Sequence, residues 1–175
     1  MNRRGRQGDD GRDLSAARAY TTALALLGRR EISAANLRTR LLRRGFAPAD
    51  VDQVIARLTQ DGTVDDRRTA AAAARLEGAI RLRGRRRVLQ KVRSLGVDAE
   101  VAAIAVDGVF AELDETALLD HAIERRLKGL DPRSLDRAAT ARIVRGLVGQ
   151  GFSPDAIFRR LRAAGARDDD GSGSA

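Results

Sequence analysis

The stretch Leu41–Phe46 reads LLRRGF: an apolar residue, three further positions, a glycine and then a large apolar residue. The same arrangement returns as VRSLGV over Val92–Val97 and as LVGQGF over Leu147–Phe152. Repetition at a period of this size indicates an array of similar supersecondary units. A glycine directly after an apolar helical stripe is typical of the residue that ends a helix in the left-handed conformation, because it has no Cβ to clash. The repeat therefore predicts three helices that each end at a glycine with positive φ, namely Gly45, Gly96 and Gly151.

The composition favours helix throughout the chain. Of its 175 residues 33% are charged and only 3% are aromatic, and there are three prolines. Strands prefer β-branched and aromatic residues, whereas Ala, Leu and Arg are good helix formers. We therefore predict an all-α fold of three tandem three-helix units, stacked in an elongated, curved row so that each unit buries more apolar surface than it could alone.

Shifts in composition divide the chain into five parts. Its first residues mix Arg, Gly and Asp without a period, and its last residues are rich in Asp, Gly and Ser, which is typical of disorder. The predicted parts are a disordered tail over 1–14, three-helix units over 15–64, 65–112 and 113–165, and a disordered acidic tail over 166–175.

Apolar residues at helical spacing predict which side chains face the core of each unit. Ser33 and Asp98 are predicted N-caps, and Pro48 suits the first turn of a helix. In the first unit the expected core residues are Tyr20, Leu24, Leu27, Leu37, Leu41, Leu42, Val51, Val54, Ile55 and Leu58. In the second they are Ala73, Leu76, Ile80, Val88, Leu89, Val92, Val101, Ile104 and Ala105. In the third they are Leu119, Ile123, Leu127, Ile143, Val144, Leu147, Val148, Ile157, Phe158 and Leu161.

Positive charge is concentrated in one segment of the middle unit. The net charge is +9, and seven cations fall within thirteen residues without an acidic residue between them. Arginine binds phosphates and carboxylates bidentately, so this segment is predicted to be a partner-binding surface, although a solvated basic loop remains the alternative. The segment, called here the basic segment, consists of Arg81, Arg83, Arg85, Arg86, Arg87, Lys91 and Arg93.

No arrangement of residues in the sequence indicates catalysis. His121 is the single histidine, and His121 with Glu124 is too small a set for a metal site. Cysteine is absent, and no phosphate-binding glycine loop or nucleophile elbow occurs. We therefore expect a protein that is not an enzyme and needs no cofactor or metal.

A helix-turn-helix DNA reader is an alternative for any small three-helix unit. Such a motif carries polar or basic residues at the start of its recognition helix. Here the third helices begin with acidic residues, at Asp50 and Asp52 and at Asp98 and Glu100, which would repel phosphates. Only the stretch from Asp155 to Arg160 is partly suitable, so sequence-specific reading of a DNA groove is not favoured.

The order and spacing of several short motifs resemble the RecX family of bacterial recombination regulators. The matching stretches span most of the chain, from Tyr20 to Leu161. They are ALALLGRR from Ala23, Leu37…Leu41…Arg44-Gly45-Phe46, Leu58…Asp61-Gly62-Thr63-Val64-Asp65-Asp66, GRRRVL from Gly84, Leu95-Gly96-Val97, and Leu147…Gly151-Phe152-Ser153-Pro154-Asp155-Ala156-Ile157. The chain departs from the family pattern at Thr69, where the family usually has an aromatic residue, and at Lys91-Val92, where it usually has an acidic residue and Leu.

The resemblance implies a specific partner and function. Members of the family bind the filament of the RecA recombinase in its helical groove, inhibit ATP hydrolysis and strand exchange, and limit repressor cleavage in the DNA-damage response. They have no known catalytic residues. The expectation is accordingly a monomeric RecA regulator with weak nucleic-acid contact and no small-molecule substrate. A non-specific basic DNA-binding helical protein remains the alternative.

The sequence also indicates a compartment. The first residues are polar and lack the apolar segment of a signal peptide, and no apolar run approaches the length of a membrane span. A soluble, cytoplasmic protein is expected.

Overall fold

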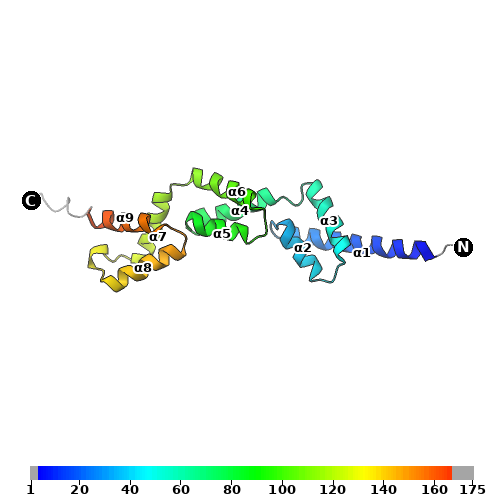
Figure 1. Cartoon of the computed structure of the whole chain (residues 1–175), viewed down its shortest axis with the longest axis horizontal. Helices are drawn as coiled ribbons and strands as arrows, with labels where there is room; N and C mark the ends of the chain where they lie inside the picture. The colour runs from blue at the N-terminus through cyan, green and yellow to red at the C-terminus, as the bar shows by residue number, and fades with distance from the viewer. Residues whose placement is uncertain (1–3, 167–175) are drawn as a thin grey trace, which may run out of the picture. The chain divides into compact units, whose positions relative to one another are not determined.

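The computed structural model describes the backbone of residues 4–166, and side chains over 15–132 and 134–164. Helices account for all of the regular structure in that range, and no strand occurs there, which confirms the all-α prediction (Figure 1). The helices are α1 (Arg4–Leu27), α2 (Ala34–Leu42), α3 (Pro48–Gln60), α4 (Asp66–Arg75), the π-helix η1 (Leu76–Ile80), α5 (Arg85–Arg93), α6 (Ala99–Glu112), α7 (Glu115–Leu127), the 3-10 turn η2 (Pro132–Ser134), α8 (Arg137–Gly149) and α9 (Pro154–Ala166).

The helix ends agree with the sequence at most positions. Gly45, Gly96 and Gly151 have φ values of +85°, +75° and +97°, as predicted. At the N-terminal side, however, α1 already begins at Arg4, within the stretch predicted to be a disordered tail. A helix nucleated further along the chain can extend backwards at little cost where no proline intervenes. Of the predicted acidic tail over 166–175, Ala166 is the last residue of α9, and 167–175 lie outside the described residues.

Residue contacts group the chain into two compact units. Unit 1 comprises Met1–Ala72 with Val92–Ala102, and unit 2 comprises Ala73–Lys91 with Ala103–Ala175. The chain therefore leaves and re-enters each unit, and the middle helices contribute residues to both. The three predicted unit boundaries stay a prediction, and the two units are described separately below.

The core of unit 1 lies between α1, α2 and α3. Alanines of α1, Ala19 and Ala23, are fully buried, whereas Leu24 is 40% exposed, contrary to the sequence prediction. The small alanine side chains let α1 lie close to its neighbours, so the face of α1 that meets the core is the alanine face. The other buried members of this core are Ile32, Leu37, Leu41, Val51, Val54, Leu58 and Val64.

Ser33 anchors the start of α2 in two directions. Its hydroxyl oxygen accepts a hydrogen bond from the backbone N–H of Asn36 at 3.3 Å, which confirms the predicted N-cap. The same hydroxyl donates to the carbonyl oxygen of Leu95, which also accepts from the Asn36 side chain at 3.0 Å. The backbone N–H of Ala34 donates to Asp66 Oδ1 at 2.9 Å. These bonds satisfy helix-end groups with partners that are distant in sequence.

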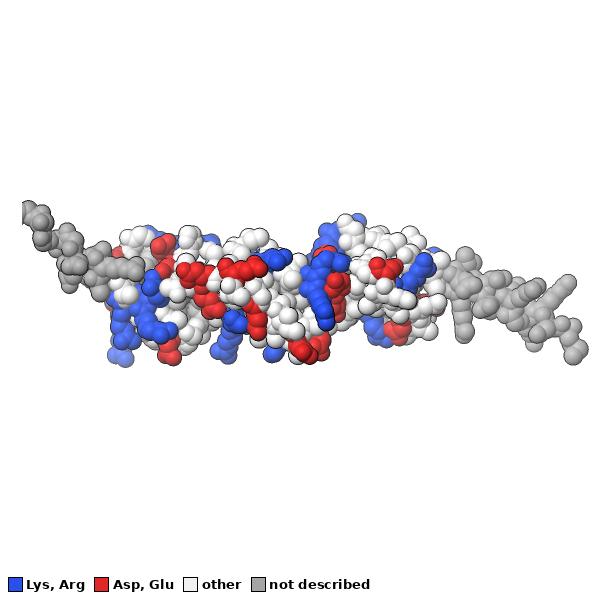
Figure 2. Space-filling view, turned by 90° about the horizontal axis from the view of Figure 1, so that it is seen from above, with Lys and Arg blue, Asp and Glu red and all other residues white. Residues whose placement is uncertain are grey.

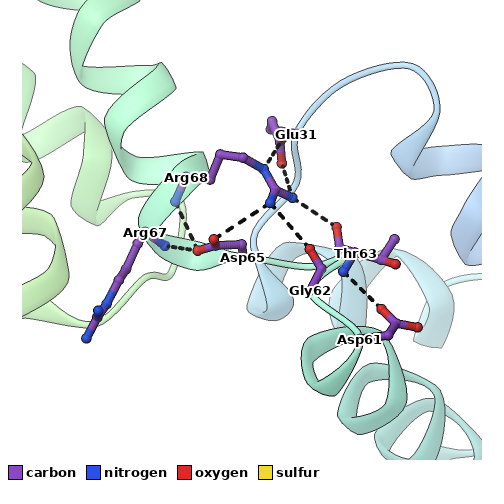
Figure 3. Close-up of polar contacts among 7 residues, drawn as sticks. All are labelled: Glu31, Asp61, Gly62, Thr63, Asp65, Arg67 and Arg68. Carbon is purple, nitrogen blue, oxygen red and sulfur yellow. Dashed lines mark hydrogen bonds and ion pairs between the residues drawn. The ribbon is translucent and has the colours of Figure 1, made fainter.

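Arg68 holds together the turn that leads from α3 into α4 (Figure 3). Its guanidinium donates to Glu31 Oε1 at 2.6 Å and to the carbonyl oxygens of Gly62 and Thr63 at 3.3 Å and 3.2 Å. Asp65 caps α4 by accepting from the backbone N–H groups of residues 67 and 68, at 2.8 Å and 3.0 Å. The bond from the Arg68 N–H is the main cause that lowers the pKa of Asp65 below its ordinary value of 3.8.

This turn makes the protein sensitive to acid. A carboxyl group whose pKa is lowered by folding stabilises the fold fully above its unfolded pKa, and that contribution is lost as the pH falls through the folded pKa. We expect the free energy of unfolding to fall between about pH 5 and about pH 2. The variant D65N keeps a capping oxygen but cannot titrate, so its stability should fall less steeply over this range. Urea unfolding at several pH values measures both slopes, and equal slopes would contradict the role of Asp65.

In unit 2 two helices turn different faces inward from those predicted. Leu76 and Ile80 are 41% and 71% exposed, whereas Glu77 and Gly78 are buried. The buried face continues at regular helical spacing from Ala70 and Ala74, so the predicted stripe is offset by one residue from Ala73 onward. The uniform alanine run over 70–74 carries no periodic signal that could select the face. In α6 the exposed residue is Ile104, and the buried face is formed by Ala102, Val106, Val109 and Phe110.

The inward faces predicted for the third three-helix unit, whose helices lie in unit 2 of the structure, are mostly correct. In α7 Leu119, Ile123 and Leu127 are buried, and so are Leu147 and Ile157. Phe158 is 42% exposed, because Ile157 occupies the buried position of that turn in α9. Helices α7, α8 and α9 contact one another (Figure 1).

Two glycines allow a close backbone contact inside unit 2. The N–H of Gly84 donates to the carbonyl oxygen of Gln150 at 3.0 Å. A Cβ on Gly84 would lie 2.5 Å from the carbonyl carbon of Gly151, and one on Gly151 would lie 2.5 Å from Arg87 Cβ. The turn before α5 and the turn after α8 therefore meet backbone to backbone, which only glycine at both positions allows.

This contact separates two glycines that look alike in sequence. In Gly45→Ala the new Cβ meets nothing within 4 Å, so only the positive φ is unfavourable, at about 1 kcal/mol. In Gly151→Ala the backbone clash adds about 1–3 kcal/mol to that cost. Urea unfolding of the two variants should show a clearly larger loss for Gly151→Ala, and equal losses would contradict the close packing.

Candidate functional site

The first two cations of the basic segment are held by a buried carboxylate. Arg81 Nη1 donates to Glu77 Oε1 at 2.7 Å, and Arg83 Nε lies 3.1 Å from Glu77 Oε2. The Glu77 side chain is only 3% exposed, whereas those of Arg81 and Arg83 are 50% and 32% exposed. Glu77 Oε2 makes no hydrogen bond of good geometry, so its contact with Arg83 is an ion pair by distance alone. One buried charge thus fixes the position of two guanidinium groups.

The backbone between η1 and α5 is unusual at Leu82. This residue has a φ of +53°, in the left-handed region that a residue with a branched side chain rarely adopts. It is the second residue after the π-helix and lies between Arg81 and Arg83. Rare backbone conformations and π-helices cluster at functional sites, which makes this corner of unit 2 a candidate.

Arg85 has a structural role. Its Nη2 donates to Asp107 Oδ1 at 2.5 Å, and its Nη1 donates to Glu115 Oε1 at 3.4 Å. Its guanidinium carbon also lies 5.7 Å from the centre of the Phe110 ring. Arg85 therefore links the start of α5 to α6 and α7, and much of its charge is compensated within unit 2.

The remaining cations of the basic segment are exposed on α5. Arg87 Nη1 donates to the neutral Gln90 side chain at 2.9 Å, and Arg86 has no ion pair among the described residues. Lys91 is exposed, and Arg93 belongs to unit 1. The seven cations therefore do not form one uniform patch. On the face in Figure 2, acidic and basic side chains lie beside one another.

Two hollows in unit 2 divide the basic segment between them. The first, called the arginine hollow, has a volume of about 750 Å³ and is lined by residues that include Arg81, Arg83, Arg87, Arg125, Arg126 and Gln150. The second, called the apolar groove, has a volume of about 930 Å³ and is lined by residues that include Arg85, Arg86, Leu89, Leu119, Phe152 and Arg159. Neither lining includes Lys91 or Arg93.

Several residues of these hollows were not singled out from the sequence. Glu77, which pairs with Arg81 and Arg83 but is not itself in either lining, gives no signal in the sequence, because an isolated glutamate in a helix is ordinarily exposed. Arg125 and Arg126 resemble the basic residues found in the last turn of many helices, and α7 ends just after them. Arg160 appears in the sequence analysis only at the end of the stretch considered for DNA reading. It donates through Nε to Asp120 Oδ1 at 2.6 Å, and this bond raises the pKa of Arg160.

The described residues include no group of three or more His, Asp or Glu side chains that could hold a metal ion. His121 is an exposed side chain of α7, and its Nδ1 lies 4.0 Å from Glu124 Oε2. None of the helices in the described part of the chain combines the length and apolar composition needed to cross a membrane.

Glu77 should be important for stability as well as for the position of its arginines. Replacing it with Gln removes a charge that pairs with two guanidinium groups, which then must rehydrate. Because both arginines already contact solvent, we expect a loss of about 1–3 kcal/mol rather than the larger cost of a wholly buried pair. The control Glu124→Gln changes an exposed side chain and should stay within about 0.5 kcal/mol of the parent protein. Thermal and urea unfolding measure both, and equal effects would contradict the anchoring role.

Known proteins resemble this chain in sequence over most of its length. A family model described as "RecX, first three-helix domain" matches residues 19–58. A "Regulatory protein RecX" from Trichlorobacter lovleyi is 33% identical over 141 residues, which is 79% of this chain and 90% of the relative. Another, from Pelodictyon phaeoclathratiforme, is 30% identical over 162 residues, which is 90% of this chain and 98% of the relative.

Solved structures have a fold similar to that of this chain. A crystal structure of a regulatory protein RecX has a TM-score of 0.78 at 16% identity and covers 93% of this chain and 79% of its own. The structure of RecX from Lactobacillus salivarius has a TM-score of 0.69 at 17% identity, with 85% and 97% covered. The sequence identity to the relatives extends well beyond the first three-helix domain, and this chain belongs to the RecX family of regulatory proteins.

Proposed function

We propose that this protein regulates the RecA recombinase by binding its filament. The observation that carries the proposal is the extent of the sequence similarity: proteins named regulatory protein RecX match this chain over 79% and 90% of its length. A regulator that acts by binding along a filament uses contacts from most of its length, so similarity over most of the chain supports the same role. Similarity limited to one domain would be compatible with other roles. The regulation proposed is inhibitory: the bound protein lies in the filament groove and restrains ATP hydrolysis, strand exchange and repressor cleavage.

The proposed mechanism is steric and allosteric rather than catalytic. A rigid body that contacts adjacent recombinase subunits holds them in one relative orientation, and a ligand shifts a conformational equilibrium only by binding one state better than another. The single histidine, His121, is exposed, and Arg81, Arg83 and Arg85 pair with carboxylates of the chain itself. We propose in addition that the protein acts as a cytoplasmic monomer and has no substrate of its own.

The apolar groove is the surface proposed to contact the recombinase. Its lining combines apolar side chains, such as Leu89 and Phe152, with the exposed guanidinium groups of Arg86 and Arg159. Neither of these two arginines has an ion pair among the described residues, whereas the neighbouring Arg85 and Arg160 do. Apolar area flanked by unpaired positive charge is complementary to an acidic protein segment, because a bare phosphate backbone would leave the apolar part uncovered.

The second candidate function, non-specific DNA binding, is supported by the net charge of +9. Association through phosphates weakens with salt, and each lost phosphate contact reduces the slope of log affinity against log salt by about one unit. This dependence distinguishes the two candidates.

The double variant Arg86→Ala/Arg159→Ala tests the proposal, because Arg85 and Arg160 are left in their structural ion pairs. We expect the variant to require at least about tenfold more protein to inhibit ATP hydrolysis by RecA on single-stranded DNA, since two charge-assisted contacts are lost. Its affinity for DNA alone, and the salt dependence of that affinity, should change little.

The control Arg43→Ala/Arg44→Ala removes the same charge from exposed positions of unit 1. It should inhibit as the parent protein does. In co-sedimentation with RecA filaments, this control should bind like the parent protein, and Arg86→Ala/Arg159→Ala should bind more weakly. Full inhibition by Arg86→Ala/Arg159→Ala would remove the apolar groove from the interface. A parallel loss of DNA affinity and salt dependence would favour the DNA-binding function instead, and absence of any binding to RecA filaments by the parent protein would refute the proposed function as a whole.

A further inference from the structure

The arginine hollow gathers positive charge from parts of the chain that are far apart in sequence. Five arginines line it: two that follow η1, one on α5 and two on α7. None of the described residues in its lining is acidic. The surface of the hollow is thus more basic than any one of the three contributing segments indicates by itself. Residues 125 and 126 were not part of the predicted partner-binding surface.

Much of this charge is not compensated within the protein. Glu77 lies behind the lining and pairs with Arg81 and Arg83. Arg87 has only a neutral partner, and Arg126 donates through Nη2 to the carbonyl oxygen of Gly146 at 3.1 Å. Over the described residues, no carboxylate pairs with Arg87, Arg125 or Arg126. Three guanidinium groups around one hollow thus face one another's repulsion without an internal counter-charge, and a bound anion would relieve it.

Two buried polar atoms of the hollow have no hydrogen-bond partner. They are Arg126 Nε, a donor, and Gln150 Oε1, an acceptor. A buried polar group without a partner costs about 1–3 kcal/mol, so such groups are rare unless something binds them. Both residues line the hollow. The unmatched donor and acceptor thus belong to two residues of the same lining.

The surrounding backbone holds Arg126 in place. A Cβ at Gly146 would lie 2.5 Å from the guanidinium carbon of Arg126, so this side chain rests directly on the backbone of α8. Leu82, with its φ of +53°, and the π-helix set the directions in which Arg81 and Arg83 leave the chain. Arg81, Arg83 and Arg126 are therefore positioned before any ligand arrives, which reduces the entropy lost on binding.

We propose that the arginine hollow is a phosphate-binding site. Guanidinium groups from three segments suit a tetrahedral, multiply charged group that accepts hydrogen bonds on several sides, whereas a carboxylate is planar and carries one charge. The phosphate can belong to a free polyphosphate or nucleotide, or to a nucleic-acid backbone; the chemistry at the hollow is the same.

The test uses the full chain and inorganic pyrophosphate as the probe, at constant ionic strength, with binding followed by calorimetry. The parent protein is expected to bind in a saturable manner with one site per chain. Arg87→Ala/Arg125→Ala changes two exposed side chains and should weaken binding at least about tenfold, because two charged contacts are lost. Arg126→Lys keeps the charge but removes the Nε–H donor, and it should also weaken binding.

The control is again Arg43→Ala/Arg44→Ala, which lowers the net charge equally and should bind pyrophosphate as the parent protein does. Non-saturable binding by the parent protein, or an equal loss in this control, would show only general attraction to positive charge and would overturn the proposal. Unchanged binding in both hollow variants would overturn it as well. Each variant is first checked by circular dichroism, and Arg126→Lys provides a second measurement should the double variant fold poorly.

A competition experiment distinguishes the two sources of phosphate. If a single-stranded oligo-dT displaces pyrophosphate from the parent protein, the hollow binds a nucleic-acid backbone. If oligo-dT fails to compete while ATP succeeds, the ligand is a free phosphate compound. Both results support a phosphate site, whereas displacement by a glutamate-rich peptide alone would assign the hollow to carboxylates and reject the proposal. No step requires RecA, so this result is independent of the proposed function.

Discussion

The close backbone contact between Gly84 and Gly151 organises unit 2. It joins the turn that starts α5 to the turn that ends α8, through the hydrogen bond from the Gly84 N–H to the Gln150 carbonyl oxygen at 3.0 Å. Gln150 lies in the lining of the arginine hollow, and Gly151 lies in the lining of the apolar groove. Both candidate surfaces therefore meet at this contact, and any side chain at either glycine would push them apart.

The second constraint is electrostatic. The sequence has a strong positive excess, yet the structure compensates it selectively: Glu77, Asp107 and Glu115 bind arginines of the basic segment. Of the basic-segment arginines in unit 2, Arg86 and Arg87 have no carboxylate partner among the described residues, and each lines one of the two hollows. The net positive charge thus indicates that the protein attracts polyanions or acidic surfaces. Only the ion pairs within the structure show which arginines remain available to bind them.

Local signals predicted the helix ends because they depend on a few neighbouring residues. Ser33, Asp98 and the three glycines all behave as their chemistry requires. The inward faces were predicted less well in two helices. Helix α6 is apolar on nearly all sides, so periodicity could not select Val106 over Ile104. Over α4 and η1 the predicted stripe was offset by one residue, because the alanine run over 70–74 has no periodic signal and the buried residue is Ala74 rather than Ala73.

The sequence by itself determined the all-helical fold, the repeated glycine-ended helices and the resemblance to the RecX family, because each is written in short stretches with regular spacing. Tertiary structure alone decided which arginines are structural and which are exposed. It paired Arg85 with Asp107 and Glu115, brought Arg126 to Arg81, and buried Glu77. The physical reason is that a guanidinium group forms ion pairs only over a few ångströms. Residues distant in sequence come that close only once the helices have packed.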